Sequence, residues 1–329
     1  MMADAWSNLG SAYHSEAHYE EAVWAYTEAI TLFEAAAKEQ EPGIGLQVQA
    51  EYLISLYYHI GLALSSLPND SCEDHSCTEQ AAEYLAKALA LDPHNSLAQH
   101  HLSSLIEDPA LPSASPDYVR RLFDSYADTF DVSLHGLGYK APDLLLEFVS
   151  ALRPRFQKCL DLGCGTGLVG ELFQKVCGEL VGIDLSPQML GVARDRGFYS
   201  TLIEGGIAEE TAKMAKQGDK AADLVVSADT LVYIGDLKEV FESVAGFLEP
   251  QHGLFAFTLE KLTAEKCQDT NCKGWSLTRA GRFAHEKGYV TALAMEQGMK
   301  VIVFEEITPR LEGGKPVEGY LVLMTMQES

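Results

Sequence analysis

A glycine-rich stretch near the middle of the chain limits the possible folds more than any other feature. A short apolar run ends at Asp161, and Gly163, Gly165 and Gly167 follow, with an apolar helical pattern directly after them. A strand, a glycine turn and a helix in this order are typical of the phosphate- or nucleotide-binding start of a doubly wound sheet. Residues 165–170 also satisfy the G-x-G-x-x-G pattern of dinucleotide-binding proteins, so the stretch alone leaves its ligand open.

The residues around this stretch alternate between helix and strand patterns. We expect helices at 117–130, 142–152, 167–176, 187–196, 236–248 and 279–297. We expect strands at 158–162, 180–184, 201–203, 223–228, 253–259, 300–306 and 320–326. Alternation of this kind predicts a parallel sheet with helices on both faces.

The connection before the last strand breaks this alternation. Residues 308–318 contain glycines and prolines but no helical pattern. A parallel crossover normally needs roughly a dozen residues or more, usually with a helix. We therefore expect the last strand to return antiparallel beside the strand at 300–306.

Residues 3–106 carry helical patterns throughout. Trp6, Leu9, Gly10 and Tyr13 share one helical face. The following helix carries small and aromatic residues at regular spacing: Ala22, Tyr26, Ala29 and Phe33. This spacing resembles the tetratricopeptide repeat (TPR), in which small residues let two antiparallel helices pack closely. A second unit is expected to be split by an inserted loop at 68–77, and a half repeat follows at 97–106.

Three prolines and a lack of periodicity mark residues 107–116 as a linker. We therefore expect a TPR-like helical domain at 1–106 and an α/β domain at 117–329. The helical domain is expected either to bind a peptide or protein partner or to serve as a structural cap.

The second domain resembles the class I S-adenosylmethionine-dependent methyltransferases. The segment from Asp161 to Gly167 matches the first motif of that family, and Asp184 matches the second. The helical repeats before it resemble those of predicted TPR-containing methyltransferases. The resemblance implies a Rossmann-like α/β fold, with a seven-stranded methyltransferase sheet and an antiparallel last strand. It also implies a transferase that uses S-adenosylmethionine (SAM) as cofactor and needs no metal.

The chemistry of the two motif acids agrees with this resemblance. The carboxylate of Asp161 suits an α-ammonium group, and Asp184, 19 positions after Gly165, suits ribose hydroxyls. As alternatives, the two acids could cap a turn and a helix. The other expected cofactor-binding residues are Gly163, Gly165, Gly167, Leu185, Glu204, Ile207, Ser227, Tyr126 and Phe130. Gly206 stands where the family usually has an acid near the adenine, so Glu204 or the backbone at Ile207 is expected to replace it.

Two segments are candidates for recognising the methyl acceptor: residues 135–140, a glycine-flexed segment suitable as a lid, and the helix expected at 279–297, where Arg279, Arg282, His285 and Tyr289 approximate one face. On the helix expected at 279–297, His285 is a candidate base and Arg282 could hold a carboxylate, while a solvated helix face is the structural alternative. Asp229, after the fourth strand, is a second catalytic candidate. The expected substrate residues are His135, Tyr139, Tyr233, Arg282 and Tyr289. The Asn/Asp-Pro-Pro-Tyr signature of amine methyltransferases is absent, which favours a small-molecule oxygen or carboxylate acceptor.

Charge and composition narrow the classes of partner. The net charge is −24 with no basic stripe, which argues against nucleic acid. No apolar run reaches the ~18 residues of a membrane span, and no secretory signal is evident, so we expect a cytoplasmic protein. The cysteines are expected to be reduced, including Cys159, Cys164 and Cys177. A metal site joining Cys72, His75 and Cys77 to Cys267 and Cys272 is a minor alternative.

Two other functions stay open at this point. An NAD(P)-dependent oxidoreductase would share the glycine turn. Two features argue against it: Asp161 would repel a pyrophosphate, and the last strand is expected to be antiparallel here, whereas it should run parallel in such an enzyme. A non-catalytic TPR scaffold with a degenerate cofactor domain is the other alternative, and Gly206 is its main support.

Overall fold

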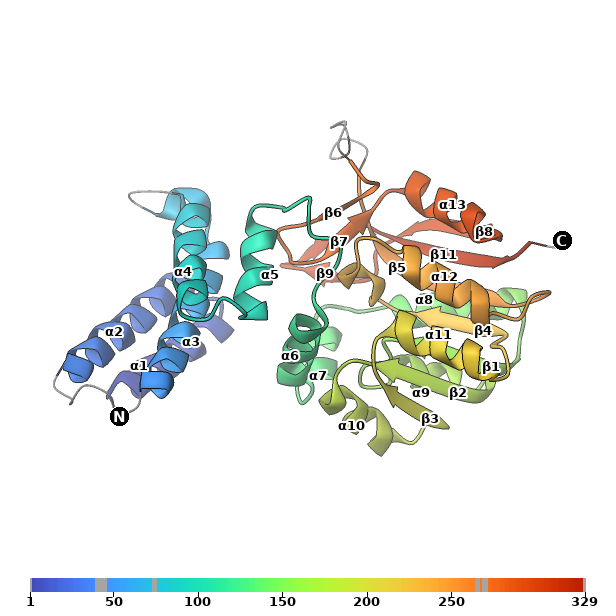
Figure 1. Cartoon of the computed structure of the whole chain (residues 1–329), viewed down its shortest axis with the longest axis horizontal. Helices are drawn as coiled ribbons and strands as arrows, with labels where there is room; N and C mark the ends of the chain where they lie inside the picture. The colour runs from blue at the N-terminus through green and yellow to red at the C-terminus, as the bar shows by residue number, and fades with distance from the viewer. Residues whose placement is uncertain (1, 39–45, 73–75, 264–266, 268–271, 328–329) are drawn as a thin grey trace. The chain divides into compact units, whose positions relative to one another are not determined.

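The computed structural model describes residues 2–38, 46–72, 76–263, 267 and 272–327. It divides into two compact units, Met1–Asp108 and Pro109–Ser329 (Figure 1). This division falls inside the segment expected to be a linker. Among the described residues, no helix combines the length and apolar character that crossing a membrane requires.

The first unit is entirely helical in its described part. Its elements are α1 (Met2–Ser15), α2 (Tyr19–Lys38), α3 (Leu46–Ser65), the short 3-10 helix η1 (Asn69–Ser71), α4 (Cys77–Leu91) and α5 (Ser96–Leu105). Small residues allow the close approach that the repeat pattern predicts: a Cβ added at Gly10 would lie 2.7 Å from the ring of Tyr26. Ala22, Tyr26 and Ala29 are buried in one core with residues of α3 and α4. The prediction of an N-terminal helical region is confirmed.

The second unit is built around a mostly parallel sheet. Its main strands are β1 (Phe156–Leu162), β2 (Cys177–Asp184), β3 (Thr201–Glu204), β4 (Leu224–Ser227), β5 (Leu254–Lys261), β8 (Met299–Ile307) and β11 (Gly319–Met326). They lie in the order β3-β2-β1-β4-β5-β11-β8. β11 is antiparallel to both β5 and β8, as the helix-free connection before it predicts.

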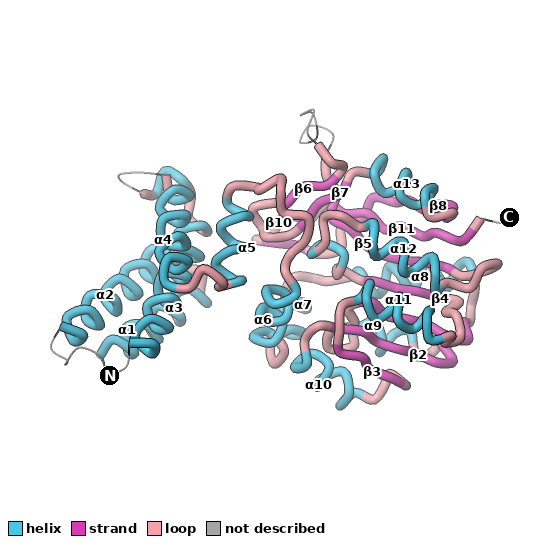
Figure 2. The backbone as a smooth tube through the Cα atoms, in the orientation of Figure 1, coloured by secondary structure: helices cyan, strands magenta, loops and turns pink. Residues whose placement is uncertain are grey.

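Helices cover both faces of this sheet (Figure 2). They are α8 (Ala141–Leu152), α9 (Leu168–Phe173), α10 (Pro187–Arg196), α11 (Ile207–Gln217), α12 (Lys238–Phe247) and α13 (Lys287–Glu296). Side chains alternate across the strands, so Leu160 packs in the core with α11, α12 and α13. Its neighbour Cys159 packs in the opposite core with α8 and α9. Burial on both faces explains why the central strands are apolar almost throughout.

Three local expectations were wrong or incomplete. The helix expected at 117–130 is two helices, α6 (Pro116–Tyr126) and α7 (Phe130–Gly136). The helix α11 was not expected. The helix expected at 279–297 begins only at Lys287, because residues before it form a hairpin of β6 (Trp275–Leu277) and β7 (Phe283–His285). Gly281, in the turn of this hairpin, has a φ of 76°, which no helix accepts.

A second small hairpin follows β8. It pairs β9 (Leu311–Glu312) with β10 (Lys315–Pro316). Gly313 and Gly314 form its turn with φ values of 54° and 75°, the left-handed pair that a tight hairpin favours. The hairpin places the residues just before it at the carboxyl end of β5.

The cysteine expectation needs correction. Cys159 of β1 and Cys177 at the start of β2 form a disulfide, because the adjacent strands place their Cα atoms 5.9 Å apart. Cys72–Cys77 and Cys267–Cys272 are also bonded, while Cys164 is free and buried. His75, the third candidate metal ligand of the inserted loop, lies outside the described residues.

Candidate active site

A cavity of about 660 Å³ opens at the carboxyl ends of β1, β2 and β4. Ligands bind at this edge in open α/β sheets, where the strand order reverses. The glycine loop after β1 and the loop after β4 form part of its wall, together with residues of α6, α7 and α11. Pro112 and Ala114, from the segment expected to be a linker, also line the cavity.

The glycines of the loop serve different purposes. Gly163, Gly165 and Gly167 have φ values of 74°, 53° and 95°, in the region that favours glycine. A Cβ at Gly163 would lie 2.2 Å from Thr230 Oγ1. Only glycine at this position therefore lets the loop after β4 pack against the glycine loop. A Cβ at Gly165 would meet only Phe130, at 3.9 Å. Gly165 therefore leaves its backbone open toward the cavity.

Asp184, at the end of β2, holds the glycine loop in place. Its Oδ2 accepts a hydrogen bond from the backbone N–H of Gly165 at 2.8 Å, and its Oδ1 accepts from Ser186 N–H at 2.8 Å. Burial raises the pKa of this carboxyl group, while the backbone donors oppose the rise. Each carboxylate oxygen can accept a further bond, and Asp184 lines the cavity.

Asp161, at the end of β1, lies deeper. It is fully buried, and its Oδ2 accepts a hydrogen bond from the hydroxyl of Tyr199 at 2.6 Å. Its Oδ1 has no hydrogen-bond partner among the residues that the structure describes. Burial raises the pKa of Asp161 to about 7, with Asp184 adding to the rise and Tyr199 opposing it. A buried carboxyl group with one unpartnered oxygen favours the arrival of a cation or a hydrogen-bond donor.

The first turn of α11 forms the wall beyond Asp184. Gly206, Ile207, Ala208 and Glu209 line the cavity. Gly206 is the N-cap of α11. Because glycine has no side chain, it accepts no side-chain hydrogen bond from the first backbone N–H groups of the helix. Glu204 is exposed and lies outside the cavity lining.

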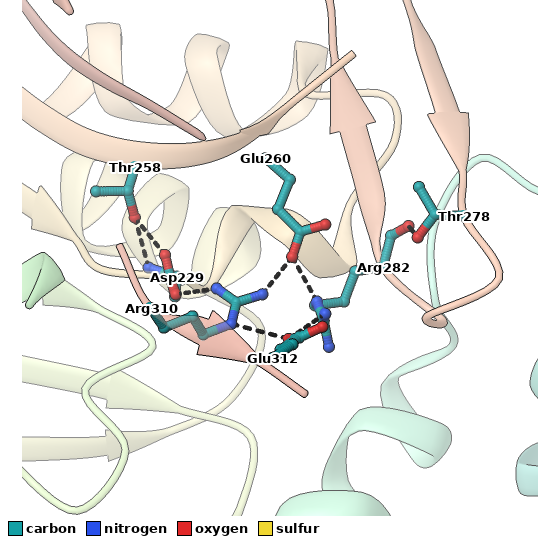
Figure 3. A network of polar contacts seen from close by, with 7 residues as sticks. All are labelled: Asp229, Thr258, Glu260, Thr278, Arg282, Arg310 and Glu312. Carbon is teal, nitrogen blue, oxygen red and sulfur yellow. Dashed lines mark hydrogen bonds and ion pairs between the residues drawn. The ribbon is translucent and has the colours of Figure 1, made fainter. Parts of the chain in front are cut away.

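A network of ion pairs contributes Asp229, Arg282, Arg310 and Glu312 to the cavity lining (Figure 3). Arg310, which is 5% exposed, contacts three carboxylates, those of Asp229, Glu260 and Glu312. Arg282 contacts Glu260 at 2.5 Å and also Glu312. The loop after β4, strand β5 and both small hairpins thus each contribute a charged side chain to one network.

Asp229 has an unusual backbone conformation within this network. Its φ is 51°, in the left-handed region that residues other than glycine seldom adopt. Thr258 stabilises the conformation twice, because its Oγ1 accepts from Asp229 N–H and donates to Asp229 Oδ1, both at 2.8 Å. Backbone strain of this kind concentrates at functional sites.

Aromatic side chains lie beside this network and the glycine loop. The ring centroid of Phe123 lies 5.9 Å from that of Phe130 and 5.3 Å from that of Tyr233. Burial raises the pKa of Tyr233 to about 12, although Arg282 and Arg310 oppose the rise. Burial, followed by the charge of Asp229, raises the pKa of Tyr139 well above its usual value. Both phenols therefore stay neutral at ordinary pH and can donate hydrogen bonds.

Comparisons with known proteins bear on this arrangement. Residues 160–257 match the model of a methyltransferase domain, and residues 3–35 match a tetratricopeptide repeat. The second unit thus contains the match to a methyltransferase domain.

A curated relative is the ubiquinone biosynthesis O-methyltransferase of Xanthomonas axonopodis pv. citri (strain 306), 30% identical over 120 residues. The match covers 36% of this chain and 50% of the relative, so the chain spans about half the length of the curated relatives it matches.

Solved methyltransferase structures also resemble the chain. N-methyltransferase NodS from Bradyrhizobium japonicum WM9, in complex with S-adenosyl-l-homocysteine, is 19% identical with a TM-score of 0.43, covering 57% of this chain and 86% of NodS. The DhpI complex with SAH is 16% identical with a TM-score of 0.46, covering 65% of this chain and 98% of DhpI.

The methyltransferase domain brings many of the expected residues together around the cavity. The expected residues that line it are Phe130, Tyr139, Gly163, Gly165, Asp184, Leu185, Ile207, Asp229, Tyr233 and Arg282. Arg310, Glu312 and Glu209 line it too, and sequence analysis missed them. Arg310 and Glu312 follow a loop without a recognisable motif, whereas the amphipathic pattern of Ile207, Thr211 and Met214 was a signal for α11 that went unused.

The expected role of His285 as a base is wrong. His285 is fully buried in β7, and its Nε2 lies 2.9 Å and 3.0 Å from the carbonyl oxygens of Ile234 and Gly235. Burial lowers its pKa to about 4, while the two carbonyls oppose this effect. Tyr289 is also structural, because its hydroxyl accepts from Leu237 N–H at 2.9 Å and donates to Asp236 at 3.1 Å.

Several other expected residues lie outside the cavity lining. Tyr126 is 47% exposed, and His135 is exposed on α7. Ser227 is buried and donates to the carbonyl of Leu162 at 3.0 Å, which joins β4 to β1. Gly167 starts α9 beside Tyr199. Among the described residues, no group of three or more His, Cys, Asp or Glu side chains is arranged to hold a metal ion.

Proposed function

We propose that the chain is a SAM-dependent methyltransferase acting on a small-molecule acceptor, with an oxygen or a carboxylate as the methylated group. The observation that carries the proposal is that Gly165 and Asp184 are hydrogen-bonded to each other at one end of an acidic cavity, with Asp161 buried just before the glycine loop. The name of the Xanthomonas relative, an O-methyltransferase, supports an oxygen acceptor.

The residues at this end suit the polar groups of SAM. The unpartnered Oδ1 of Asp161 suits an α-ammonium group, and the free lone pairs of Asp184 suit ribose hydroxyls. Gly165 leaves space for a ligand against the backbone, and the first turn of α11 offers N–H groups to a heterocycle. When bound, SAM supplies a methyl group attached to a positively charged sulfur.

The charge of the cavity favours a cationic cofactor over a dinucleotide. Six carboxylates line it, against three cationic side chains. The carboxylates are Asp184, Glu209, Asp229, Asp236, Glu239 and Glu312, and the cations are Lys238, Arg282 and Arg310. Such a lining attracts a sulfonium and repels a pyrophosphate. This charge weakens the case for an NAD(P)-dependent oxidoreductase, and the open cavity weakens the case for a non-catalytic scaffold.

We also propose the domain boundaries 1–106, 107–116 and 117–329, with the helical domain either binding a protein partner or serving as a structural cap. The repeat match at 3–35 supports a partner. Residues 1–108 contain 17 acidic residues (5 Asp and 12 Glu) and only two lysines, so a basic partner segment suits them best.

A thermal-shift experiment tests the proposed cofactor. We expect SAM and its product S-adenosylhomocysteine (SAH) to raise the melting temperature of the purified chain, and NAD⁺ and NADH to leave it unchanged. A shift with NADH alone would contradict the proposal. No shift with any of these ligands would favour the scaffold.

A further inference from the structure

The polar end of the cavity has an excess of negative charge. The network contains three carboxylates, Asp229, Glu260 and Glu312, against the two guanidinium groups of Arg282 and Arg310. An added carboxylate would increase this imbalance beside side chains that are mostly buried, where charges are weakly screened. An anionic acceptor is therefore disfavoured at this end.

Asp229 is presented to the cavity as a hydrogen-bond acceptor. Its two oxygens take one bond each, from Thr258 and Arg310, so each keeps a free lone pair. The strained backbone at φ 51° and the double contact with Thr258 fix its orientation. Arg310, buried between three carboxylates, acts as a positioning residue for Asp229.

Tyr139 and Tyr233 supply two phenol groups to the cavity lining. Both residues line the cavity, and the charge of Asp229 acts on both phenols. A neutral phenol can donate one hydrogen bond and accept another. A ligand group that accepts a hydrogen bond from a phenol and donates one to Asp229 can therefore be held in one orientation.

The rest of this end is apolar. Phe123, Leu134, Leu137, Val232 and Ile234 line the same cavity. An acceptor that fills the cavity therefore needs an apolar body, because unpaired polar groups would lose their hydration here without compensation.

We propose that the acceptor is an uncharged hydroxyl compound with an apolar body, and that Asp229 accepts its hydroxyl proton during methyl transfer. This inference rests on the proposed function and narrows it, since it selects a hydroxyl over a carboxylate. The hydroxyl accepts a hydrogen bond from a phenol while it donates to Asp229.

The transfer balances with these groups alone. The hydroxyl oxygen forms a bond to the methyl carbon as the bond between that carbon and the sulfur breaks, and the bonding pair stays on sulfur. The hydroxyl proton passes to the carboxylate of Asp229, which later releases it to water. A positive sulfur and a negative carboxylate become two neutral groups, so the transfer leaves no separated charges.

An amine acceptor uses these residues less well. A neutral amine attacks through its lone pair and forms a charged ammonium product, so it needs no proton acceptor at the moment of transfer. A fixed carboxylate beside the reacting atom is of most use for a hydroxyl.

The test uses the full chain, SAM with an isotope-labelled methyl group, and an extract of small molecules from the source cells. The labelled product is identified by mass spectrometry, and SAH binding is measured separately by calorimetry. We expect the label in a methyl ether. We expect Asp229→Asn, which keeps the side-chain shape, to lower the transfer rate by about 100-fold or more with SAH affinity unchanged within about twofold.

A matched control variant, and the kind of atom to which the labelled methyl group is bonded, decide between the outcomes. Asp128→Asn removes the same charge at an exposed position outside the cavity and should transfer at the wild-type rate. A methyl ester, an N-methyl product, no labelled product, or full activity in Asp229→Asn would each overturn the inference while SAH still binds. Loss of SAH binding in the wild-type chain would instead overturn the proposed function.

Discussion

At the residue scale, Asp161 links the stability of the methyltransferase domain to pH. Burial disfavours its charged form and raises its pKa from the ordinary value of 3.8 to about 7 in the folded state. Between pH 3.8 and about pH 7, the folded state therefore keeps a proton on Asp161 that the unfolded state has already released. Stability falls as pH rises through this window, by at most about 4 kcal/mol.

We predict that Asp161→Asn removes this part of the pH dependence. Urea unfolding at pH 5 and pH 8 measures it, with Trp275 as the probe in a chain that carries Trp6→Phe and Trp24→Phe. The parent chain should lose stability between the two pH values, and Asp161→Asn should lose less. Equal losses in both chains would show that the proton on Asp161 does not govern the effect.

Gly163 and Gly197 form a matched pair for testing the glycine loop. Their φ values of 74° and 71° are nearly the same, but a Cβ at Gly163 would overlap Thr230 whereas one at Gly197 would meet nothing within 4 Å. We predict that Gly197→Ala costs about 1 kcal/mol and Gly163→Ala about 2–4 kcal/mol, because a steric clash adds to the backbone strain. Chemical denaturation of both variants measures the difference, and equal costs would contradict the packing role of Gly163.

Individual residues also show what the sequence could predict. Asp161, Gly165 and Asp184 belong to a recognisable pattern, and the structure places Gly165 and Asp184 in the cavity lining, whereas Asp161 is fully buried outside it. Tyr199, which bonds to Asp161 from 38 positions away, carries no local signal. Pairings of this kind depend on tertiary packing, so periodicity and spacing do not reveal them.

At the scale of elements, the segment leading into the β9–β10 hairpin depends on the buried charge of Arg310. Removing one partner of a buried ion pair typically costs about 3–5 kcal/mol, because the remaining charges are left uncompensated. We predict a loss of this size for Arg310→Met, which would leave three carboxylates close together. Lys315→Met, at an exposed position of β10, should change stability by no more than about 0.5 kcal/mol. Equal effects of the two substitutions in denaturant unfolding would argue against the network.

The hairpin of β6 and β7 shows why one element was mistaken. Arg279, Arg282, His285 and Tyr289 approximate one face of the helix expected at 279–297, and their spacing is compatible with a helix. Gly281 and the buried alternation of Trp275 and Leu277 carried the competing strand signal. A helical spacing of four polar residues is weak evidence, because a turn between two short strands can produce it.

At the scale of the whole molecule, the two units should respond to acid in opposite ways. His59 and His101 of the helical unit have pKa values of about 4, because burial disfavours their charged forms, with His14 and His100 adding to the effect. Both folded-state pKa values lie below the ordinary histidine value of 6.5. The stability of this unit is therefore complete above pH 6.5 and is lost as pH falls toward 4.

We predict that the helical unit loses up to roughly 3 kcal/mol for each of these histidines between pH 6.5 and pH 4. Emission from Trp6 and Trp24, in a chain with Trp275→Phe, follows this unit during urea unfolding. His59→Gln should reduce the acid sensitivity, and His94→Gln, at an exposed position, should not. An unchanged acid sensitivity in His59→Gln would contradict the assignment.

The general architecture was the most predictable level. The apolar strands, the helix-free connection at 308–318 and the small residues of the first unit led to the sheet, its antiparallel last strand and the helical region. The acceptor end was the least predictable, because Asp229, Glu260, Arg282 and Arg310 come from four separate segments. Only the folded chain brings these charges together.

The central claim is that the cavity holds SAM through the end of β2. Calorimetric titration of SAH into the wild-type chain, Asp184→Ala and Glu204→Ala tests it most directly, because Asp184 lines the cavity and Glu204 does not. We predict that Asp184→Ala weakens binding by about 100-fold or more, since bonds to a charged group are lost, while Glu204→Ala binds as the wild type does. Wild-type affinity in Asp184→Ala, or no binding of SAH to the wild-type chain, would contradict the claim.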